Sequence, residues 1–238
     1  MAILVGTSGY AFKEWKGPFY PAKLPDKEML GWYAGKFPTV EINNTFYRMP
    51  REKNLLDWAA QVPESFTFAI KASQRITHHA QLRDCGELVG YLSQTVAVLG
   101  PRLGPTLFQL PPHLKRDLPR LEAFLDIVPK RWRIAMEFRH PSWFEDDQVF
   151  GILKARNAAL TISDQEGVEP PVVATADFGY VRLHRFDYDE AMLAGWADRI
   201  RELNWPNAWV YFKHDHGPGS GPPVAEALIA KLGAAATS

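Results

Sequence analysis

The sequence has little cysteine, no excess of charge of either sign and no long apolar run. Cys85 is the single cysteine among 238 residues, which excludes an internal disulfide and a cysteine-based metal centre. Basic and acidic residues number 27 each, so no global electrostatic field draws the chain to nucleic acid. The balanced total does not exclude a local basic pocket. No segment approaches the roughly 20 apolar residues of a membrane span, and residues 1–9 lack the pattern of a signal peptide. These absences predict a cytoplasmic protein with no membrane partner.

What the chain does contain is a regular alternation of short β-type runs with longer helical patterns. Strands are predicted at Ile3–Ser8, Thr39–Asn43, Phe66–Ala72, Thr106–Leu110, Arg133–Phe138, Ala159–Ser163, Tyr180–His184 and Trp209–His214. Helices are predicted at Lys27–Lys36, Leu55–Gln61, Leu88–Leu99, Leu118–Ile127, Gln148–Arg156, Glu190–Leu203 and Val224–Leu232. Eight strands separated by helices indicate parallel βαβ units. We therefore predict an α/β fold, a single-domain (β/α)8 TIM-barrel-like structure over residues 1–233, with a doubly wound open sheet as the alternative.

Three segments interrupt this repeat. Thr7–Pro25 is rich in aromatic residues, with Gly and Pro among them, and is predicted to be a long structured loop. His214–Pro223 is rich in Gly and Pro and is predicted to be a mobile loop after the last strand. Residues 234–238 are expected to form a disordered tail.

Polar residues recur on one face of the predicted strands, near their C-terminal ends. Residues two apart in a strand share a face, so Glu137 lies with Ala135 and opposite Met136. The bulky apolar face suits packing beneath the outer helices, and the polar face then points into the barrel. This argument brings together Glu41, Lys71, Gln109, Glu137, Arg182 and Lys213, with Asp164 and His184 at the rim. Isolated buried charges cost several kcal/mol each, so such residues must pair with one another or meet a ligand.

A catalytic interpretation assigns Glu41 and Glu137 as general acid and base, provided their environments separate their pKa values. His184 and Asp164 are further candidate catalytic groups at the rim. The cations would hold an anionic group and stabilise developing negative charge; they are Lys71, Arg182 and Lys213. Tyr10, Trp15 and Tyr47 could form an apolar wall against a ring.

A purely structural interpretation of the same residues stays open. The charged set could close into a salt-bridge network that fills the barrel. Gln109 could satisfy a neighbouring backbone group, and His184 could be a hydrogen-bonded core histidine. His78 follows Gln74 and Arg75 in a predicted loop and could simply be exposed. The aromatic residues of the first loop could form a small satellite core.

Several strings, in order along nearly the whole chain, resemble the YecE-like family of unknown function. They are GTSGYAFKEWKGPFYP (Gly6–Pro21), VEINNTFYRMP (Val40–Pro50), FTFAIKAS (Phe66–Ser73), ITHH (Ile76–His79), LFQLPP (Leu107–Pro112), EFRHPSWF (Glu137–Phe144), YVRLH (Tyr180–His184) and VYFKHD (Val210–Asp215). The resemblance implies a TIM-barrel-type fold and no established activity. Together with the face pattern, its motif positions make Asn43, Gln109, Arg139 and His78 candidate ligand contacts. The family's likeness to sugar isomerases and to abasic-site endonucleases is analogy at the level of the fold.

The sequence departs from the family pattern at three places. The family often has Gly after the histidine of the seventh strand, where this chain has Arg185, and an Asn pair where this chain has Lys213 and His214. The late loop offers Gly219–Pro223 in place of the usual small-residue and Asn pattern. If that loop sets substrate choice, the substrate of this member differs from that of its relatives.

Three functions compete. The first is an enzyme that uses acid–base chemistry on a small anionic ligand, sugar-like or nucleotide-like.

The second is a metal-assisted phosphodiester hydrolase, with Glu41, Glu137, Asp164, His184 and His214 as oxygen and imidazole ligands. No His-Glu-x-x-His motif is present and nearby cations would repel a divalent ion, so no cofactor is expected, a divalent metal being the alternative. The third is a non-catalytic nucleic-acid binder, with a local basic patch from Arg48, Arg51, Arg75, Lys115, Arg116, Arg139, Arg182, Arg185 and Lys213.

Overall fold

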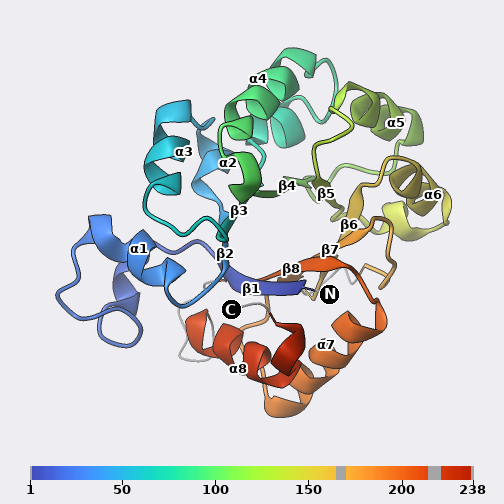
Figure 1. Cartoon of the computed structure of the whole chain (residues 1–238). Helices are drawn as coiled ribbons and strands as arrows, with labels where there is room; N and C mark the ends of the chain where they lie inside the picture. Colours follow the sequence, from blue (N-terminus) through green and yellow to red (C-terminus); the bar gives the residue numbers. More distant parts are fainter. Residues whose placement is uncertain (1, 165–169, 214–220, 237–238) are drawn as a thin grey trace.

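Eight parallel strands close into one barrel in the order β1 to β8, and β8 returns to pair with β1 (Figure 1). The structure is a computed structural model and describes residues 2–164, 170–213 and 221–236. The strands are β1 (Ala2–Ser8), β2 (Thr39–Ile42), β3 (Thr67–Lys71), β4 (Leu103–Gln109), β5 (Ile134–Glu137), β6 (Ala159–Ser163), β7 (Phe178–Leu183) and β8 (Asn207–Lys213). The predicted single barrel is confirmed, and the open sheet is not found.

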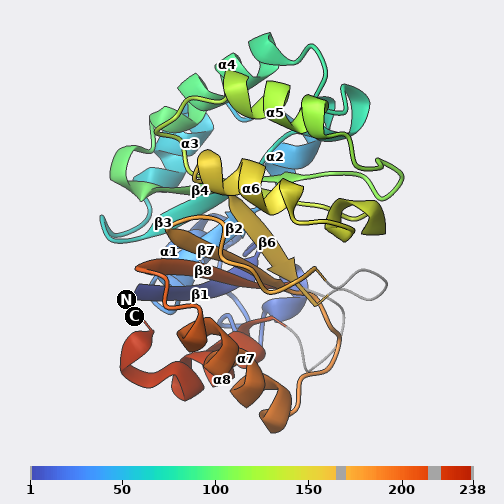
Figure 2. The ribbon, with the colours of Figure 1, turned by 90° about the vertical axis from the view of Figure 1, so that its right-hand side faces the viewer.

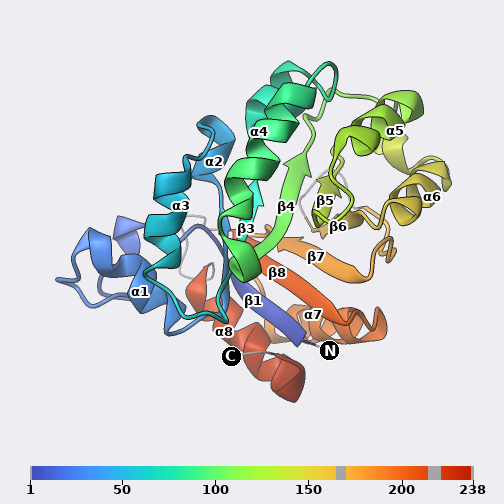
Figure 3. The same cartoon turned by 45° about the horizontal axis from the view of Figure 1, so that its top comes forward.

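The helices surround the barrel on its outside, as Figures 2 and 3 show. They are α1 (Met29–Ala34), α2 (Asn44–Tyr47), α3 (Glu52–Ala59), α4 (Gly86–Ala97), α5 (Leu118–Ile127), α6 (Gln148–Ala155), α7 (Glu190–Glu202) and α8 (Pro222–Leu232). Single turns occur at Lys13–Trp15, Asp26–Glu28, Arg75–His79, Gly100–Arg102, Pro141–Phe144 and Gly233–Ala235. Within the described ranges, none of the helices is long and apolar enough to cross a membrane.

The described part of the connection from β6 to β7 contains no helix. Beside α7 a cavity of about 1020 Å³ opens there, lined by Ile162, Val172 and Trp196 among others. The residues of β6 are nevertheless all buried.

The strand boundaries differ from the predictions where Gly and Pro suggested a loop. β4 begins at Leu103, three residues before the predicted start, and includes Gly104 and Pro105. The backbone of Phe68 and the Trp209 ring approach Gly104 within 3.2 Å of where a Cβ would lie, so a side chain there would have to displace them slightly. β7 likewise begins at Phe178 because its parallel register with β8 extends back to Asn207.

The described part of the expected tail continues the fold. Gly233, with φ of +59°, ends α8 and turns the chain, and residues 233–235 form a further turn. Ala236 then forms a bridge with Ile3 of β1. The two ends of the described chain consequently lie side by side at the same end of the barrel (Figure 1). The correction concerns residues 234–236, since residues 237 and 238 lie outside the described part.

Two apolar clusters divide the barrel wall as the alternation predicted. The larger one lies between strands and helices and takes Val40, Ile70, Met136, Val181 and Phe212. The smaller one fills the barrel from inside with Leu4, Ala69, Leu107, Ala135, Ala159, Phe178, Tyr180, Trp209 and Tyr211. Above it, polar residues continue the same inward face toward the C-terminal mouth, the end where (β/α)8 barrels carry their sites.

Candidate functional site at the barrel mouth

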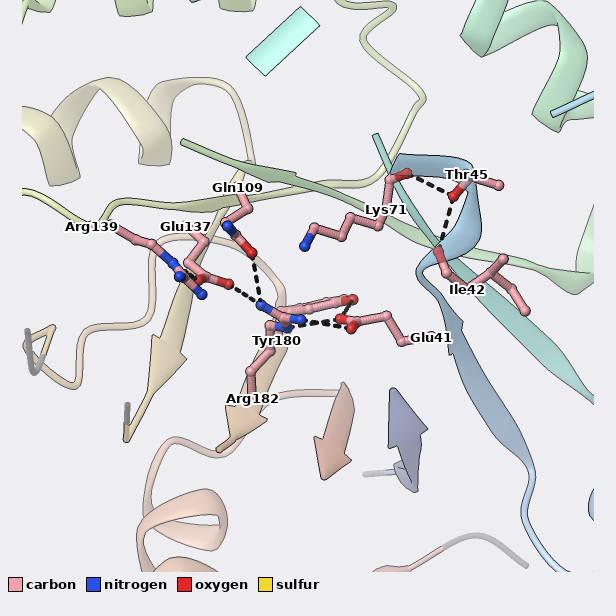
Figure 4. Close-up of polar contacts among 9 residues, drawn as sticks. All are labelled: Glu41, Ile42, Thr45, Lys71, Gln109, Glu137, Arg139, Tyr180 and Arg182. Carbon is pink, nitrogen blue, oxygen red and sulfur yellow. Dashed lines mark hydrogen bonds and ion pairs between the residues drawn. The ribbon is translucent and has the colours of Figure 1, made fainter. Parts of the chain in front are cut away.

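Arg182 lies at the centre of the polar cluster and contacts both buried glutamates (Figure 4). Its Nε and Nη2 donate to the two carboxylate oxygens of Glu41 at 2.9 Å, a bidentate pair. Its Nη1 donates to Glu137 Oε2 at 2.6 Å and to Gln109 Oε1 at 3.3 Å. The register of parallel strands places these residues at one level, because Glu41, Gln109 and Glu137 all lie at the C-terminal ends of their strands. The predicted convergence is thus found.

The same pairs keep both glutamates ionised. Burial alone would raise the pKa of Glu41, but Arg182, together with the hydroxyl of Tyr180 at 2.7 Å, lowers it below its ordinary value. Burial also opposes ionisation of Glu137, yet the charges of Arg182 and Arg139 lower its pKa to about 2. Both pKa values are thus lowered together, and the separation that an acid–base pair would need is not seen in the described residues. Each carboxylate is paired with at least one arginine.

Lys71 ends β3 with its side chain directed into the mouth, between Gln109 and the pair formed by Arg182 and Glu41 (Figure 4). The amine lies 4.4 Å from the centre of the Phe46 ring. It forms no hydrogen bond or ion pair with any residue in the described part of the chain. Burial lowers its pKa, the charge of Arg182 lowers it further, and the result is about 8. At neutral pH a measurable share of this amine is therefore uncharged.

Arg139 follows β5 and extends the cluster toward solvent. Its Nε donates to Glu137 Oε1 at 2.8 Å, and its side chain is about one-quarter exposed, at 24%. Neither terminal guanidinium nitrogen has a partner among the described residues, so both donors are available to a ligand. Two carboxylates face three cations at this level, and the site carries a net positive charge.

His184, which follows β7, and Asp164, which follows β6, form a second, linked group. The backbone N–H of His184 donates to Asp164 Oδ1 at 2.6 Å, and Tyr188 donates its hydroxyl to Oδ2 at 2.6 Å. Burial raises the pKa of Asp164, and burial together with Arg182 lowers that of His184 well below its ordinary value. The imidazole is therefore neutral at pH 7. Its Nε2 is buried and has no hydrogen-bond partner among the described residues.

His78 lies near the same cations, in the π-helical turn Arg75–His79 rather than in an irregular loop. Its Nδ1 pairs with Thr77 Oγ1 at 2.8 Å, and its ring meets Phe46 edge-on at 4.9 Å. Burial, followed by the charge of Lys71, lowers its pKa. Asn43 caps the short helix α2 next to Glu41, and its buried Oδ1 also lacks a partner in the described chain.

The three aromatic residues predicted to form a wall against a ligand lie in different surroundings. Trp15 is buried, lies 4.7 Å from Phe12 and 5.6 Å from Phe19 between ring centres, and belongs to the larger apolar cluster. Tyr10 is half-buried and packs against Tyr33 at 6.3 Å. Tyr47 is 74% exposed and packs edge-on against Phe46. Trp15 therefore packs as a core residue, and it does so in the main core rather than in a separate small one.

The last predicted members lie at the end of β8. Lys213 is exposed and its charge reaches His184. His214, predicted as a metal ligand, lies outside the described residues. Within residues 2–164, 170–213 and 221–236, no three His, Cys, Asp or Glu side chains gather closely enough to hold a metal ion.

Sequence reasoning missed three groups at this site. Ser8 ends β1 beside Glu41 and Lys213, and its buried hydroxyl has no partner among the described residues. Ser8 lies an even number of residues after Leu4, so strand alternation in the sequence already indicates that its side chain points into the barrel. Tyr180 shares a strand face with Arg182, so its inward direction could be predicted from the sequence in the same way. Tyr188 lies in a loop, where no periodicity indicates the direction of a side chain.

Fold and site define a parallel (β/α)8-barrel protein with a polar, cationic cluster at the C-terminal mouth. The chain belongs to the family described as "Protein of unknown function DUF72", whose pattern matches residues 4–238. The UPF0759 protein YunF of Bacillus subtilis is 28% identical over 90% of this chain and 79% of its own length. The UPF0759 protein YecE of Escherichia coli is 38% identical over 47% of this chain, a match that spans 42% of YecE.

Solved structures share the fold. A DUF72 family protein of Thermotoga maritima superimposes with a TM-score of 0.84 at 23% identity, covering 98% of this chain and 99% of that one. A DUF72 family protein of Enterococcus faecalis gives a TM-score of 0.78 at 19% identity, with 97% of both chains covered. A D-psicose 3-epimerase of Clostridium cellulolyticum gives 0.50 at 11% identity, covering 86% of this chain and 90% of that one. At these identities the likeness concerns the fold alone.

Proposed function

We propose that this protein is an enzyme that binds a small anionic ligand, sugar-like or nucleotide-like, at the barrel mouth and moves protons on it. The observation that carries the proposal is a ring of polar groups without partners in the described chain. They come from five strand ends: Ser8 Oγ, Asn43 Oδ1, Lys71 Nζ, the terminal nitrogens of Arg139, and His184 Nε2. Buried polar atoms are nearly always hydrogen-bonded, so such a ring calls for a ligand or ordered water.

The charge of the ring favours an anion. Arg182 neutralises one unit of the negative charge on Glu41 and Glu137, and Arg139 neutralises the other. Lys71 remains as an excess cation, and Lys213 adds to the positive charge near His184. A phosphate or carboxylate group would accept hydrogen bonds from Lys71 and Arg139, and such charge-assisted bonds are the strong ones.

Proton transfer in this proposal falls to the groups that are neutral or partly neutral at pH 7. His184 holds an unprotonated imidazole, and Lys71 exchanges a proton within one or two pH units of neutrality. A catalytic base works best when its pKa lies near the working pH, which suits Lys71 better than the two ionised glutamates. Asp164 and Tyr188 act as positioning residues, because they fix the backbone at His184 rather than reaching the ring.

Ligand binding by the Arg139→Gln variant tests the proposal. Sugar phosphates, sugar acids and nucleoside monophosphates are screened for an increase in the melting temperature of the wild-type protein, and the best ligand is titrated by calorimetry. Loss of charge-assisted hydrogen bonds worth about 1.5–3 kcal/mol weakens binding by roughly 10- to 150-fold. Arg201→Gln, which removes a surface arginine paired with Asp198, is the matched control and keeps wild-type affinity. Equal affinity of Arg139→Gln and wild type, or no binding by the whole panel, would refute the proposal.

A further inference from the structure

Lys71 is the buried group whose surroundings are least explained by folding alone. Its backbone is held firmly, because the hydroxyl of Thr45 donates to the Lys71 carbonyl oxygen at 2.7 Å and to that of Ile42 at 2.9 Å (Figure 4). The amine itself points into the mouth and has no hydrogen-bond or ion-pair partner in the described chain. A flexible side chain that only needed to satisfy its charge would pair with a carboxylate, but both nearby carboxylates already bind arginines.

We propose that Lys71 Nζ is a nucleophile that forms a Schiff base with an anionic aldehyde or ketone of the sugar-phosphate or oxo-acid type. This inference rests on the ligand site proposed above and names its substrate class. The neutral amine attacks the carbonyl carbon and forms a C–N bond, while the carbonyl electron pair moves to oxygen. The oxygen takes up the two protons that the amine nitrogen gives up and leaves as water, and the nitrogen keeps the carbon as an imine, which can then take a proton from solvent. One amine and one carbonyl give one imine and one water, so no further reactant is needed.

The groups that face Lys71 come from every side of the mouth. They are Glu41 on β2, Glu137 and Arg139 at β5, Arg182 on β7 and His78 in the turn after β3. Burial, followed by the charge of Arg182, lowers the pKa of the amine, whereas the glutamates limit that effect. The Phe46 ring covers one side of the amine at 4.4 Å. A ring face attracts the charged amine less strongly than a carboxylate partner would, so it leaves more of the amine uncharged than an ion pair does. Cationic neighbours are also a recognised way to activate a lysine for attack on a carbonyl.

The pKa of Lys71 is lowered enough to make this lysine react faster than the other lysines of the chain. With a pKa of about 8 in place of the ordinary 10.5, the uncharged fraction at pH 7.5 increases by roughly 200-fold. A less basic amine is also a weaker nucleophile, so a gain in reaction rate of at least about tenfold is expected over an exposed lysine.

Trapping by reduction tests the inference directly. The full-length protein is incubated at pH 7.5 with pyridoxal 5′-phosphate, or with the two-carbon aldehyde glyoxylate, and reduced with cyanoborohydride. Peptide mass spectrometry then gives the rate of labelling at each lysine. We expect Lys71 to be labelled at least about tenfold faster than Lys53, an exposed lysine paired with Asp57. The labelling rate of Lys71 should reach half of its maximum near pH 8.

Two variants serve as controls. Lys71→Arg keeps the charge and removes the nucleophile, so rapid labelling disappears, whereas Lys53→Arg leaves it unchanged. Lys71 labelled no faster than Lys53 by either aldehyde overturns the inference. If a sugar phosphate nevertheless binds in the Arg139-dependent manner, the proposed anion site stands and Lys71 serves only as a cation. Rapid labelling of Lys71 with no binding of any anionic sugar or nucleotide instead removes the proposed ligand class and keeps the reactive amine.

Discussion

At the scale of single residues, the buried glutamates are held ionised by arginine, and this links stability to pH. Glu137 has a pKa of about 2 in the folded chain, below its ordinary 4.5, once the charges of Arg182 and Arg139 outweigh the cost of burial. The unfolded chain therefore takes up a proton first as the pH falls. The stability that Glu137 contributes is complete above about pH 4.5 and is lost as the pH falls toward about 2.

Glu137→Gln tests this linkage. At pH 7 the variant should unfold more easily by on the order of 3 kcal/mol, which is the value of a shift of that size. The difference from wild type should shrink steadily in urea titrations between about pH 4.5 and 2. Glu190→Gln, a substitution at a 97% exposed side chain, is the control and should show no such trend. A difference between wild type and Glu137→Gln that is constant with pH would contradict the linkage.

Lys71 differs from Glu137 in that its charged form destabilises the folded chain. Its folded pKa lies below the unfolded value, so the unfolded chain binds more protons between about pH 8 and 10.5 and stability increases with pH in that window. Below pH 8 the charged amine is destabilising. Lys71→Met should therefore stabilise the protein at pH 7, by up to about 3 kcal/mol, and the gain should vanish by about pH 10.5. Urea midpoints at the two pH values measure it. A loss of stability at pH 7 would show that the amine supports the fold.

Residue types and alternation were enough to predict the cluster of Glu41, Lys71, Glu137 and Arg182, because strand geometry fixes which side chains point inward. The division of roles within the cluster was not predictable. It depends on which carboxylate oxygens meet Arg182, and a pattern of residue types does not contain those distances. For the same reason Trp15 was assigned to a ligand wall, since only packing shows that its ring faces other aromatic residues.

At the scale of elements, β7 and the segment before β8 fit together through a glycine. A Cβ on Gly179 would lie 2.2 Å from the Trp205 ring, so the two elements pack at this distance only without a side chain. Gly179→Ala should destabilise the protein by about 2–3 kcal/mol in urea unfolding, because an added methyl group in a well-packed core forces neighbouring side chains and backbone to shift. Gly151→Ala on α6, where nothing lies within 4 Å, should instead be neutral or stabilising by up to about 1 kcal/mol.

A double substitution separates the two explanations for such a loss. Trp205→Leu removes the ring atoms that a Cβ at Gly179 would meet, so the penalty of Gly179→Ala should be smaller in that background. An undiminished penalty would mean that glycine is required for its backbone and not for the close approach.

The element pattern also shows where sequence reasoning ends. Helix and strand order could be predicted because each unit alternates a short apolar run with a periodic helix. The starts of β4 and β7 could not, since Gly104 and Gly179 resemble loop residues until the partners that crowd them are known. The ordered turn at Gly233–Ala235 was missed for a related reason, because it depends on pairing with β1 at the far end of the chain.

At the scale of the whole molecule, charge is balanced globally and concentrated locally. The chain carries no net charge, while Lys71, Arg139, Arg182 and Lys213 gather at one mouth. Among the other basic residues of the predicted nucleic-acid patch, Arg116 is paired with Asp146 and so adds little free positive charge. A local site of this kind suits a ligand with one or two negative groups better than a polyanion, which needs a continuous basic track.

The response to salt distinguishes these two kinds of ligand. A ligand held through Lys71 and Arg139 makes few ionic contacts, so its affinity should fall by less than about tenfold between 50 and 200 mM salt. A nucleic acid bound through 6–10 phosphates would lose about 10³–10⁵ in affinity over the same interval. Titration of a sugar phosphate by calorimetry and of a labelled single-stranded oligonucleotide by fluorescence anisotropy measures both. An oligonucleotide that binds tightly with the steep slope would contradict the small-ligand site, because that affinity requires a surface that the cluster at the mouth does not by itself supply.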